Sequence, residues 1–320
     1  MKAIRQIVAV LALVMLAGSA QAGLSLTPDG VSRGFTLTTI ASNFPTIPTL
    51  TGGPFGVFYS TSGLLVTDGA DSSVRLFKKD CDGQDASTNR PTAFYAVGLQ
   101  GPLGMTEAHL HGKPKYYLIT APGEVFQINA DGTPIQKVLT VPGNFKFADI
   151  AFDPHFGVLL ATAAACGDDI DFSCGGIFSI DPVAMTSTEI APNFSVTGLQ
   201  VDASDNIFIN FFFFGTIWFN PDFSIKSIFP LPEAESLVLG TGTLADHIFL
   251  WDHNGELWEQ NLDGSDLTMI ASGGELNPIA TADPHNGSLV FTDHDKVVRL
   301  SGGGLASADG ETQVNSCMDK

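Results

Sequence analysis

The chain has 320 residues, of which 44% are hydrophobic and only 15% are charged, and its formal net charge is −19. About 25% of residues are charged in an ordinary globular domain, so this composition favours strands buried on both faces over a helical or disordered chain. A surface of this negative charge repels nucleic acid and anionic membranes, although the acidity can also serve solubility alone. It favours cations, basic proteins or neutral ligands instead.

The segment over positions 1–22 has the pattern of a cleaved secretory signal peptide. Lys2 and Arg5 precede an uninterrupted apolar run over residues 7–17, and Ala-Gln-Ala at residues 20–22 supplies a cleavage site. The apolar run is shorter than the roughly 20 residues that a membrane-spanning helix needs. Removing this segment takes away two basic residues and no acidic one, so the net charge becomes −21. We therefore expect a periplasmic or secreted protein without a membrane span.

Four cysteines lie beyond the signal peptide, and an even number in an exported chain predicts disulfides. Cys166 and Cys174 bound one short loop, so we pair them with each other. This leaves Cys81 to pair with Cys317, which would tie the C-terminal tail to the first repeat.

Short motifs recur along the chain and define six units. Gly-Pro-Phe-Gly at residues 53–56 recurs as Gly-Pro-Leu-Gly at residues 101–104, and Asp-Pro-His occurs at both 153–155 and 283–285. The first strands of the aligned units start near Phe55, Leu103, Ala148, Thr197, Ser236 and Pro278. The units follow one another every 39 to 49 residues, and each contains short apolar strands separated by turns. A four-stranded unit of about 45 residues is typical of a β-propeller blade.

The sixth unit lacks a fourth strand of its own. Its three strands are expected at residues 278–283, 288–293 and 296–300, whereas residues 34–41 near the N-terminus form a spare strand. Borrowing that strand would close the ring and remove an open sheet edge. We therefore predict an all-β fold, with a signal peptide at 1–22, a single six-bladed propeller at 23–304 and a C-terminal tail at 305–320.

The sequence Leu-Leu-Val-Thr-Asp-Gly-Ala-Asp-Ser-Ser-Val-Arg-Leu-Phe at residues 64–77 resembles the blade core of NHL and YWTD repeats and of SMP-30/gluconolactonase-like propellers. The resemblance covers roughly residues 34–300. It implies a metal-dependent lactonase or related hydrolase, with a calcium or similar ion held at the mouth of the central channel by Glu, Asn and Asp. The usual Glu-Gly-Pro of that group is replaced here by Gly-Gly-Pro at residues 52–54. Its Pro-Asn-Gly element is absent, and Asn277 is the nearest trace.

Three oxygen-bearing side chains from different blades align at the channel mouth: Asp149, Glu235 and Asn277. Such a set suits a hard cation such as Ca²⁺, which could polarise a carbonyl or activate water. The alternative is that Asp149 and Glu235 are ordinary turn residues.

A second acidic group consists of Asp80, Asp82 and Asp85 in the sequence Asp-Cys-Asp-Gly-Gln-Asp. The spacing is that of a calcium-binding loop, but the downstream bidentate Glu of an EF-hand is missing. A solvated acidic turn beside a disulfide explains the same residues.

The turns between second and third strands begin with aspartate in three units, and such side chains are expected to cap the turn. These aspartates are Asp68, Asp252 and Asp293. His253 and His294 follow two of them and are candidates for a general base or a ligand. The histidines of the two Asp-Pro-His motifs, His155 and His285, are instead assigned to turns on the opposite face.

Four consecutive phenylalanines at residues 211–214 end one strand and start a turn. Burial in the core explains them, but if Phe213 and Phe214 reach the surface they form an apolar contact for a ligand or partner.

The sequence supports two main hypotheses about function. The first is an exported binding module for a protein, glycan or small molecule, because the family's ligands and any nucleophile motif are missing. The second is a calcium-dependent hydrolase of the lactonase or esterase type that uses Asp149, Glu235 and Asn277. A propeller lyase is a third possibility, and it would need a histidine and a carboxylate facing a common pocket.

Overall fold

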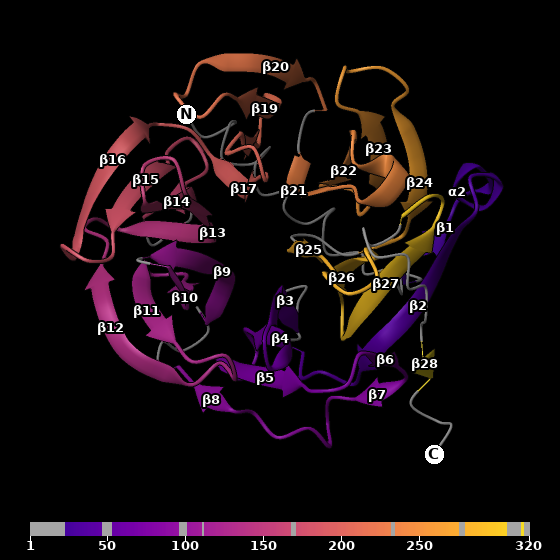
Figure 1. Ribbon diagram of the computed structural model, residues 1–320, viewed down its shortest axis with the longest axis horizontal. Helices are drawn as coiled ribbons and strands as arrows, with labels where there is room; N and C mark the ends of the chain where they lie inside the picture. Colours follow the sequence, from indigo (N-terminus) through magenta and orange to yellow (C-terminus); the bar gives the residue numbers. More distant parts are fainter. Residues whose placement is uncertain are drawn as a thin grey trace, which may run out of the picture.

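The computed structural model describes residues 23–46, 53–95, 101–110, 112–167, 171–231, 234–274, 279–305 and 315–316. Over these residues the chain forms six sheets arranged as blades around a central axis (Figure 1). The first strand of each blade lies next to the axis, and the others follow outward. The predicted six-bladed β-propeller is therefore confirmed.

Blades 1 to 3 each pair their strands in the antiparallel order of a meander. Blade 1 contains β3 (Pro54–Ser60), β4 (Gly63–Asp68), β5 (Ser73–Phe77) and the short β8 (Ala93–Phe94). Blade 2 contains β9 (Pro102–Leu110), β10 (Lys113–Thr120), β11 (Glu124–Ile128) and β12 (Pro134–Thr140). Blade 3 contains β13 (Phe145–Asp153), β14 (Val158–Cys166), β15 (Gly176–Asp181) and β16 (Thr186–Pro192).

Blades 4 to 6 repeat this order, and strands from the N-terminal part of the chain are added to blades 5 and 6. Blade 4 contains β17 (Val196–Val201), β18 (Ile207–Phe211), β19 (Gly215–Phe219) and β20 (Ile225–Phe229). Blade 5 contains β21 (Ala234–Leu239), β22 (His247–Asp252), β23 (Leu257–Asn261) and β24 (Thr268–Ser272), with the 3₁₀ turn η1 (Gly242–Leu244) between its first two strands. Blade 6 contains β25 (Ala280–Ala282), β26 (Leu289–Asp293), β27 (Lys296–Gly302) and β2 (Phe35–Ser42).

The ring is closed by the N-terminal strand β2, as the sequence predicts. It pairs antiparallel with β27, with Leu37 opposite Leu300 (Figure 1). Phe35 and Ile40 of β2 are buried, so the strand contributes apolar side chains as well as hydrogen bonds. A strand supplied by the other end of the chain replaces an edge that would otherwise be open.

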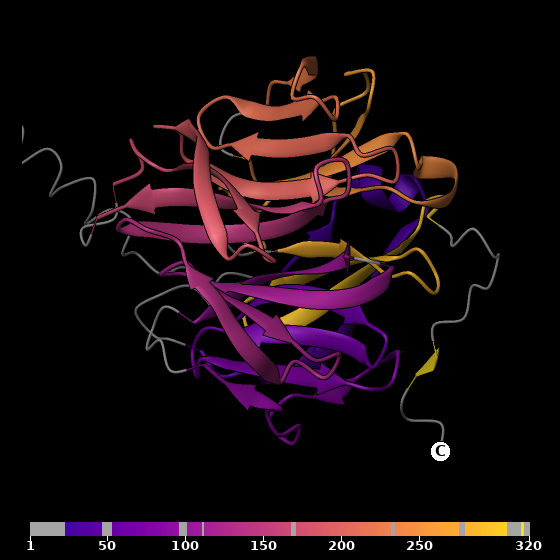
Figure 2. The same ribbon diagram turned by 60° about the vertical axis from the view of Figure 1, so that its left-hand side comes forward.

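Several short elements extend the blades beyond what the sequence predicts. β1 (Ser25–Leu26) adds to β24, and α2 (Pro28–Ser32) follows it with Thr27 as its N-cap. β7 (Gln84–Asp85) adds parallel to β2. β6 (Cys81–Asp82) pairs in parallel with β28 (Asn315–Ser316), which lies outside the ring in Figure 2.

The core consists of apolar layers between neighbouring blades. Because side chains alternate along a strand, adjacent residues of one strand enter different layers. In β14, Leu159 packs in the layer between blades 2 and 3, whereas Leu160 packs in the layer between blades 3 and 4. Middle strands are therefore buried on both faces, and this explains their continuous apolar runs. Within the described part of the chain, no helix is long and apolar enough to cross a membrane.

Candidate functional site

The channel mouth is the end of the propeller axis at which the first strands of the blades begin. In blades 1 to 5, the pairing of the first strand with the second is irregular at this end. A bulge of this kind bends the strand and redirects a side chain. Two of the predicted metal ligands, Asp149 in β13 and Glu235 in β21, lie at these irregular positions. The third, Asn277, lies outside the described residues.

Asp149 is held between neighbouring blades. Its Oδ1 accepts the N–H of Ile150 at 2.8 Å, and its Oδ2 accepts the N–H of Leu199 in blade 4 at 3.2 Å. Blade 2 also approaches closely, because a Cβ added to Gly104 would lie 2.5 Å from Oδ1. Burial raises the pKa of Asp149 to about 7, although the two N–H groups oppose the rise. This carboxyl therefore titrates near neutral pH, and a bound cation would favour its ionised form.

Glu235 and His253 form a carboxylate–imidazole pair. Oε1 of Glu235 lies 2.6 Å from Nδ1 of His253, and the Glu235 side chain is 3% exposed whereas that of His253 is 36% exposed. The edge of the imidazole packs on Phe212, with ring centroids 5.6 Å apart. A carboxylate that contacts one ring nitrogen orients the imidazole and stabilises its protonated form. The structure thus brings together one predicted metal ligand and one predicted catalytic candidate.

His294, the other catalytic candidate, lies in the turn between β26 and β27. Its Nδ1 lies 2.9 Å from Oδ1 of Asp293, and its backbone is left-handed with φ of 53°. Oδ2 of Asp293 accepts the N–H of Leu24 at 3.2 Å. This histidine therefore belongs to a turn that also anchors the start of the described chain.

Asp68 and Asp252 cap their turns as the sequence predicts. Oδ1 of Asp68 accepts the N–H of Ala70 at 2.9 Å. Oδ1 of Asp252 accepts the N–H of Asn254 at 2.9 Å, and its Oδ2 accepts the indole N–H of Trp258 at 3.1 Å. Burial raises the pKa of Asp68 to about 6, with a further contribution from a neighbouring carboxylate. These contacts are the turn-capping contacts that the sequence predicts for the two side chains.

A second candidate for a metal group lies on the opposite face and consists of Asp80, Asp283 and His285. Their potential ligand atoms all lie within 4.8 Å of one another. The buried guanidinium of Arg299 makes an ion pair with Asp80 and lies 3.9 Å from Asp283. The hydroxyl of Tyr59 donates to Asp283 at 2.9 Å. Because Arg299 already supplies a positive charge here, these residues fit a second cation poorly.

The predicted calcium loop is divided between two sets of partners. Asp80 contacts Arg299, and Oδ1 of Asp82 lies 3.7 Å from Nε of the same guanidinium. Asp85 instead accepts the N–H of Ser87 at 2.9 Å and its hydroxyl at 2.7 Å. These hydrogen bonds lower the pKa of Asp85, which is the behaviour of an exposed turn aspartate.

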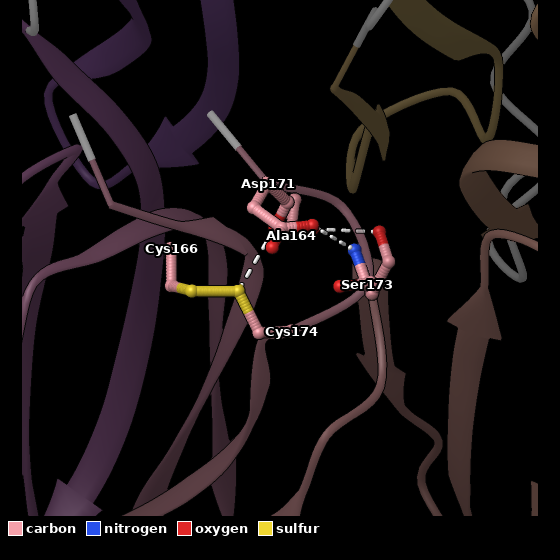
Figure 3. Close-up of a disulfide and its surroundings, with 6 residues drawn as sticks. Ala164, Cys166, Asp171, Ser173 and Cys174 are labelled. Atoms are coloured by element: carbon pink, nitrogen blue, oxygen red, sulfur yellow. Dashed lines mark hydrogen bonds between the residues drawn. A yellow bond between two sulfur atoms is a disulfide. The ribbon is translucent and has the colours of Figure 1, made fainter. Parts of the chain in front are cut away.

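Cys166 and Cys174 form a disulfide with Cα atoms 5.7 Å apart, which is the pair predicted from their shared loop (Figure 3). Within this loop, Oδ1 of Asp171 accepts the N–H of Ser173 at 2.8 Å. Asp171 and Cys166 also exchange backbone hydrogen bonds. A disulfide fits an oxidising compartment outside the cytoplasm.

Cys81 is also disulfide-bonded. Its predicted partner, Cys317, lies outside the described residues. Residues 315–316 nevertheless lie beside Cys81, because Asn315 of β28 pairs with it.

The central channel contains a cavity of about 420 Å³ that runs from Asp149 toward the opposite face. Its lining includes the polar side chains of Thr106, Glu107, Gln200 and Thr281. Polar groups that converge in a cavity of this size are the usual setting for a small-molecule site. The channel therefore offers space next to Asp149.

The comparisons with known proteins agree with this architecture. A gluconolactonase from Xanthomonas campestris superposes with a TM-score of 0.63 over 88% of this chain and 95% of its own, at 13% sequence identity. A protein described in structural-genomics work as a gluconolactonase superposes with a TM-score of 0.59 over 88% of this chain and 99% of its own, also at 13% identity. The predicted resemblance to the SMP-30/gluconolactonase-like propellers is thus confirmed for the fold. No protein-family model and no curated protein matches the sequence.

Sequence reasoning did not find the contacts of Asp283 with Tyr59 and Arg299. The repeated Asp-Pro-His motif correctly indicates turns, because the N–H of His285 donates to Asp283 at 2.9 Å and the N–H of His155 donates to Asp153 at 2.9 Å. The motif carries no signal about which side chains from other blades reach the second carboxylate oxygen.

Proposed function

We propose that the protein is a hydrolase of the lactonase or esterase type, with its reaction centre at the channel mouth. The observation that carries this proposal is the pair formed by buried Glu235 and half-exposed His253, whose atoms Oε1 and Nδ1 lie 2.6 Å apart. An imidazole oriented in this way is suited to take a proton from water. The likeness in fold to a gluconolactonase, and to a second protein assigned to that class in structural-genomics work, supports the same choice of reaction.

The residues at the channel mouth can carry out ester hydrolysis with His253 moving the proton. Nε2 of His253 would accept a proton from water as the water oxygen attacks the ester carbonyl, and Glu235 would stabilise the resulting imidazolium. The same proton would then pass to the alkoxide oxygen as its bond to the acyl carbon breaks. In a lactone that oxygen stays in the product, which is a hydroxy acid.

Asp149 and Glu235 have the donor chemistry that a calcium ion requires. Both are carboxylates, and a carboxylate oxygen can accept more than one contact. When bound, the ion would supply polarisation of the substrate carbonyl. Asp149 would serve to hold it, and the raised pKa of this carboxyl means that ion binding would release a proton near neutral pH.

A binding module remains the second candidate because aromatic side chains gather beside His253. Phe212 contacts the imidazole, Phe172 stacks on Phe212 at 5.9 Å, and Phe213 is 55% exposed. Phe214 is exposed as well, so core burial does not account for these last two rings of the phenylalanine run. Aromatic platforms of this kind bind glycans and protein partners as readily as substrates.

The test is hydrolysis of glucono-δ-lactone and of an aryl acetate by the mature protein, followed by pH-stat titration. We expect His253→Gln to lose about 10²- to 10⁴-fold in kcat/KM. The matched control is His247→Gln in the same blade, since Nδ1 of His247 also lies 2.9 Å from a buried carboxylate, that of Glu259. Equal activity of the two variants would contradict the proposal.

Metal dependence is a separate arm of the same experiment. Activity lost in EDTA and restored by millimolar Ca²⁺, with the restoration abolished in Asp149→Asn, would support an ion at the mouth. Activity that is indifferent to EDTA would assign the reaction to Glu235 and His253 alone. If the protein hydrolyses no ester but is retained on a glycan or protein matrix, the binding module is favoured.

A further inference from the structure

A large apolar cavity lies between blades 3 and 4, away from the channel. Its volume is about 1040 Å³, and every residue that lines it is apolar except Asp153 and Ser179. Leu160 and Ile177 line it from blade 3, and Ile217 lines it from blade 4. Figure 2 turns this side of the molecule toward the viewer. The volume is at the upper end of the roughly 300–1,000 Å³ that small-molecule sites occupy.

The rim of the cavity exposes large aromatic side chains. Phe156 is 55% exposed, Phe194 is 41% exposed and Phe214 is 62% exposed, although all three line the cavity. Exposed apolar groups that converge on one concavity mark a binding site more often than scattered ones do.

Asp153 gives this cavity a polar end. The side chain is fully buried, and its Oδ1 accepts the N–H groups of His155 at 2.9 Å and of Phe156 at 3.3 Å. Among the described residues, its Oδ2 has no hydrogen-bond partner. This buried oxygen is therefore an acceptor that a donor from outside the chain can satisfy.

The equivalent aspartate in blade 6 shows which contact Asp153 lacks. Asp283 lies in the same Asp-Pro-His turn, and its Oδ1 accepts the N–H of His285 at 2.9 Å just as Asp153 does with its own turn. Its Oδ2, however, accepts the hydroxyl of Tyr59 at 2.9 Å. In blade 3 no described side chain takes the place of that hydroxyl, and the cavity lies there instead.

Two titratable side chains act on Asp153: the carboxylate of Asp205 and the imidazole of His155. Burial raises the pKa of Asp153 first of all, nearby Asp205 raises it further, and the exposed His155 lowers it. The whole chain carries a net charge of −19. An anionic head group would be repelled at this end of the cavity, whereas an ammonium group would be attracted.

We infer that the cavity between blades 3 and 4 binds an apolar molecule with one amino group, whose ammonium contacts Oδ2 of Asp153 and whose hydrocarbon part lies among the apolar side chains. A flat surface of a second protein would not reach a fully buried carboxyl. A slender amine is better suited to it, because its head group is small and its hydrocarbon chain can lie along the apolar side chains of the cavity. This site is independent of the channel mouth and of the reaction proposed there.

The first experiment is displacement of the fluorescent probe N-phenyl-1-naphthylamine from the mature protein by decylamine, decanol and decanoate. We expect decylamine to bind at least tenfold more tightly than decanol, and decanoate to bind most weakly. Shortening the amine to octylamine and hexylamine should weaken binding about fourfold per methylene. Equal affinity of decanoate and decylamine would overturn the assignment of the head group.

Two variants and one control locate the site. Ser179→Trp fills the cavity and should abolish probe binding. Gln127→Trp changes the equivalent position of the third strand in blade 2 and should not. Asp153→Asn keeps an oxygen for the turn, and it should remove the preference for decylamine over decanol. Binding that survives Ser179→Trp would overturn the proposal.

Other occupants give different results. A second copy of the chain would show as a dimer in size-exclusion chromatography that excludes the probe, and this would overturn the small-molecule assignment. If Asp153→Asn does not fold, the ranking of the three decyl compounds on the wild-type protein still decides the head group. The two proposals fail separately, because equal hydrolysis by His253→Gln and His247→Gln leaves the ranking of the three decyl compounds unaffected, and equal binding of decanoate and decylamine leaves the hydrolysis result unaffected.

Discussion

The interfaces on the two sides of blade 3 are built differently. Toward blade 2, the rings of Phe145, Phe147 and Phe178 contact one another with centroids 5.0 to 6.3 Å apart, and they fill the space between the sheets. Toward blade 4, the corresponding outer space is the cavity of about 1040 Å³. A propeller therefore tolerates an unfilled outer interface when the first strands still pack around the axis.

One strand accounts for much of this difference. Residues of β15 alternate between the two interfaces, so Phe178 faces blade 2 while Ile177 and Ser179 face blade 4. A bulky ring enters one layer, and a small hydroxyl enters the other. The contrast shows that the contents of a blade interface are determined residue by residue, while the repeat determines only the positions of the strands.

The largest expected effect comes from truncating two neighbouring leucines of β14. Leu159→Ala opens a void in the filled interface and should lower the free energy of unfolding by about 3–5 kcal/mol. Leu160→Ala enlarges a space that already exists, so fewer contacts are lost, and we expect about 2–3 kcal/mol. Both side chains are buried, at 0% and 1% exposure, so burial alone does not separate them.

Urea unfolding followed by circular dichroism measures this difference. The order of the two values is the decisive result. If Leu160→Ala were as destabilising as Leu159→Ala, the cavity would be filled or closed in solution, and the contrast between the interfaces would be lost.

The inner end of the blade 3–4 interface should respond to pH through Asp149. Burial raises its folded pKa to about 7, whereas an unfolded aspartate titrates near 4. The folded chain thus binds the extra proton, and the stability that it contributes is full below about pH 4 and lost as the pH rises to about 7. We expect this carboxyl to lower the free energy of unfolding by about 2–4 kcal/mol across that window.

Asp149→Asn isolates this contribution because an amide does not titrate. Thermal unfolding in EDTA between pH 4.5 and pH 8 should show the wild type losing stability relative to the variant as the pH rises. A constant difference across this range would show that Asp149 is solvated, which would place it outside the packed interface. Millimolar Ca²⁺ that restores wild-type stability at pH 8 would connect this carboxyl to ion binding.

The fold could be predicted from the sequence because its determinants are local and repeated. Turn residues recur every 39 to 49 residues, and the missing fourth strand of the sixth unit leaves only residues 34–41 to close the ring. The first strands predicted near Thr197 and Ser236 begin within a few residues of β17 and β21. The short β1 and β7 escaped prediction because two residues carry no periodic signal.

The site could be predicted only in part because it depends on contacts between blades. Glu235 and His253 were each candidates, but 18 residues separate them and their pairing was not foreseen. The unpartnered oxygen of Asp153 was equally invisible, since its difference from Asp283 depends on Tyr59, which lies in another blade. Spacing in a repeat places a residue on a face, whereas the identity of its neighbour requires the packed structure.

The smallest expected effect is seen when one phenylalanine from each of the two interfaces is truncated. Phe145 joins two other rings, with centroids 5.0 and 6.3 Å away, whereas the ring of Phe156 is 55% exposed and stacks across the cavity on Phe223 at 6.3 Å. We expect Phe145→Ala to lower the free energy of unfolding by about 2–3 kcal/mol and Phe156→Ala by less than about 1 kcal/mol. Denaturant titration of both variants, with and without decylamine, measures the two losses of stability.

With decylamine present, Phe156→Ala should gain less stability than the wild type, because part of the rim that covers the ligand is gone. The opposite outcome is that Phe156→Ala, without any ligand, loses as much stability as Phe145→Ala does. In that case the stack of Phe156 on Phe223 supports the fold, and the rim is a structural contact between the blades.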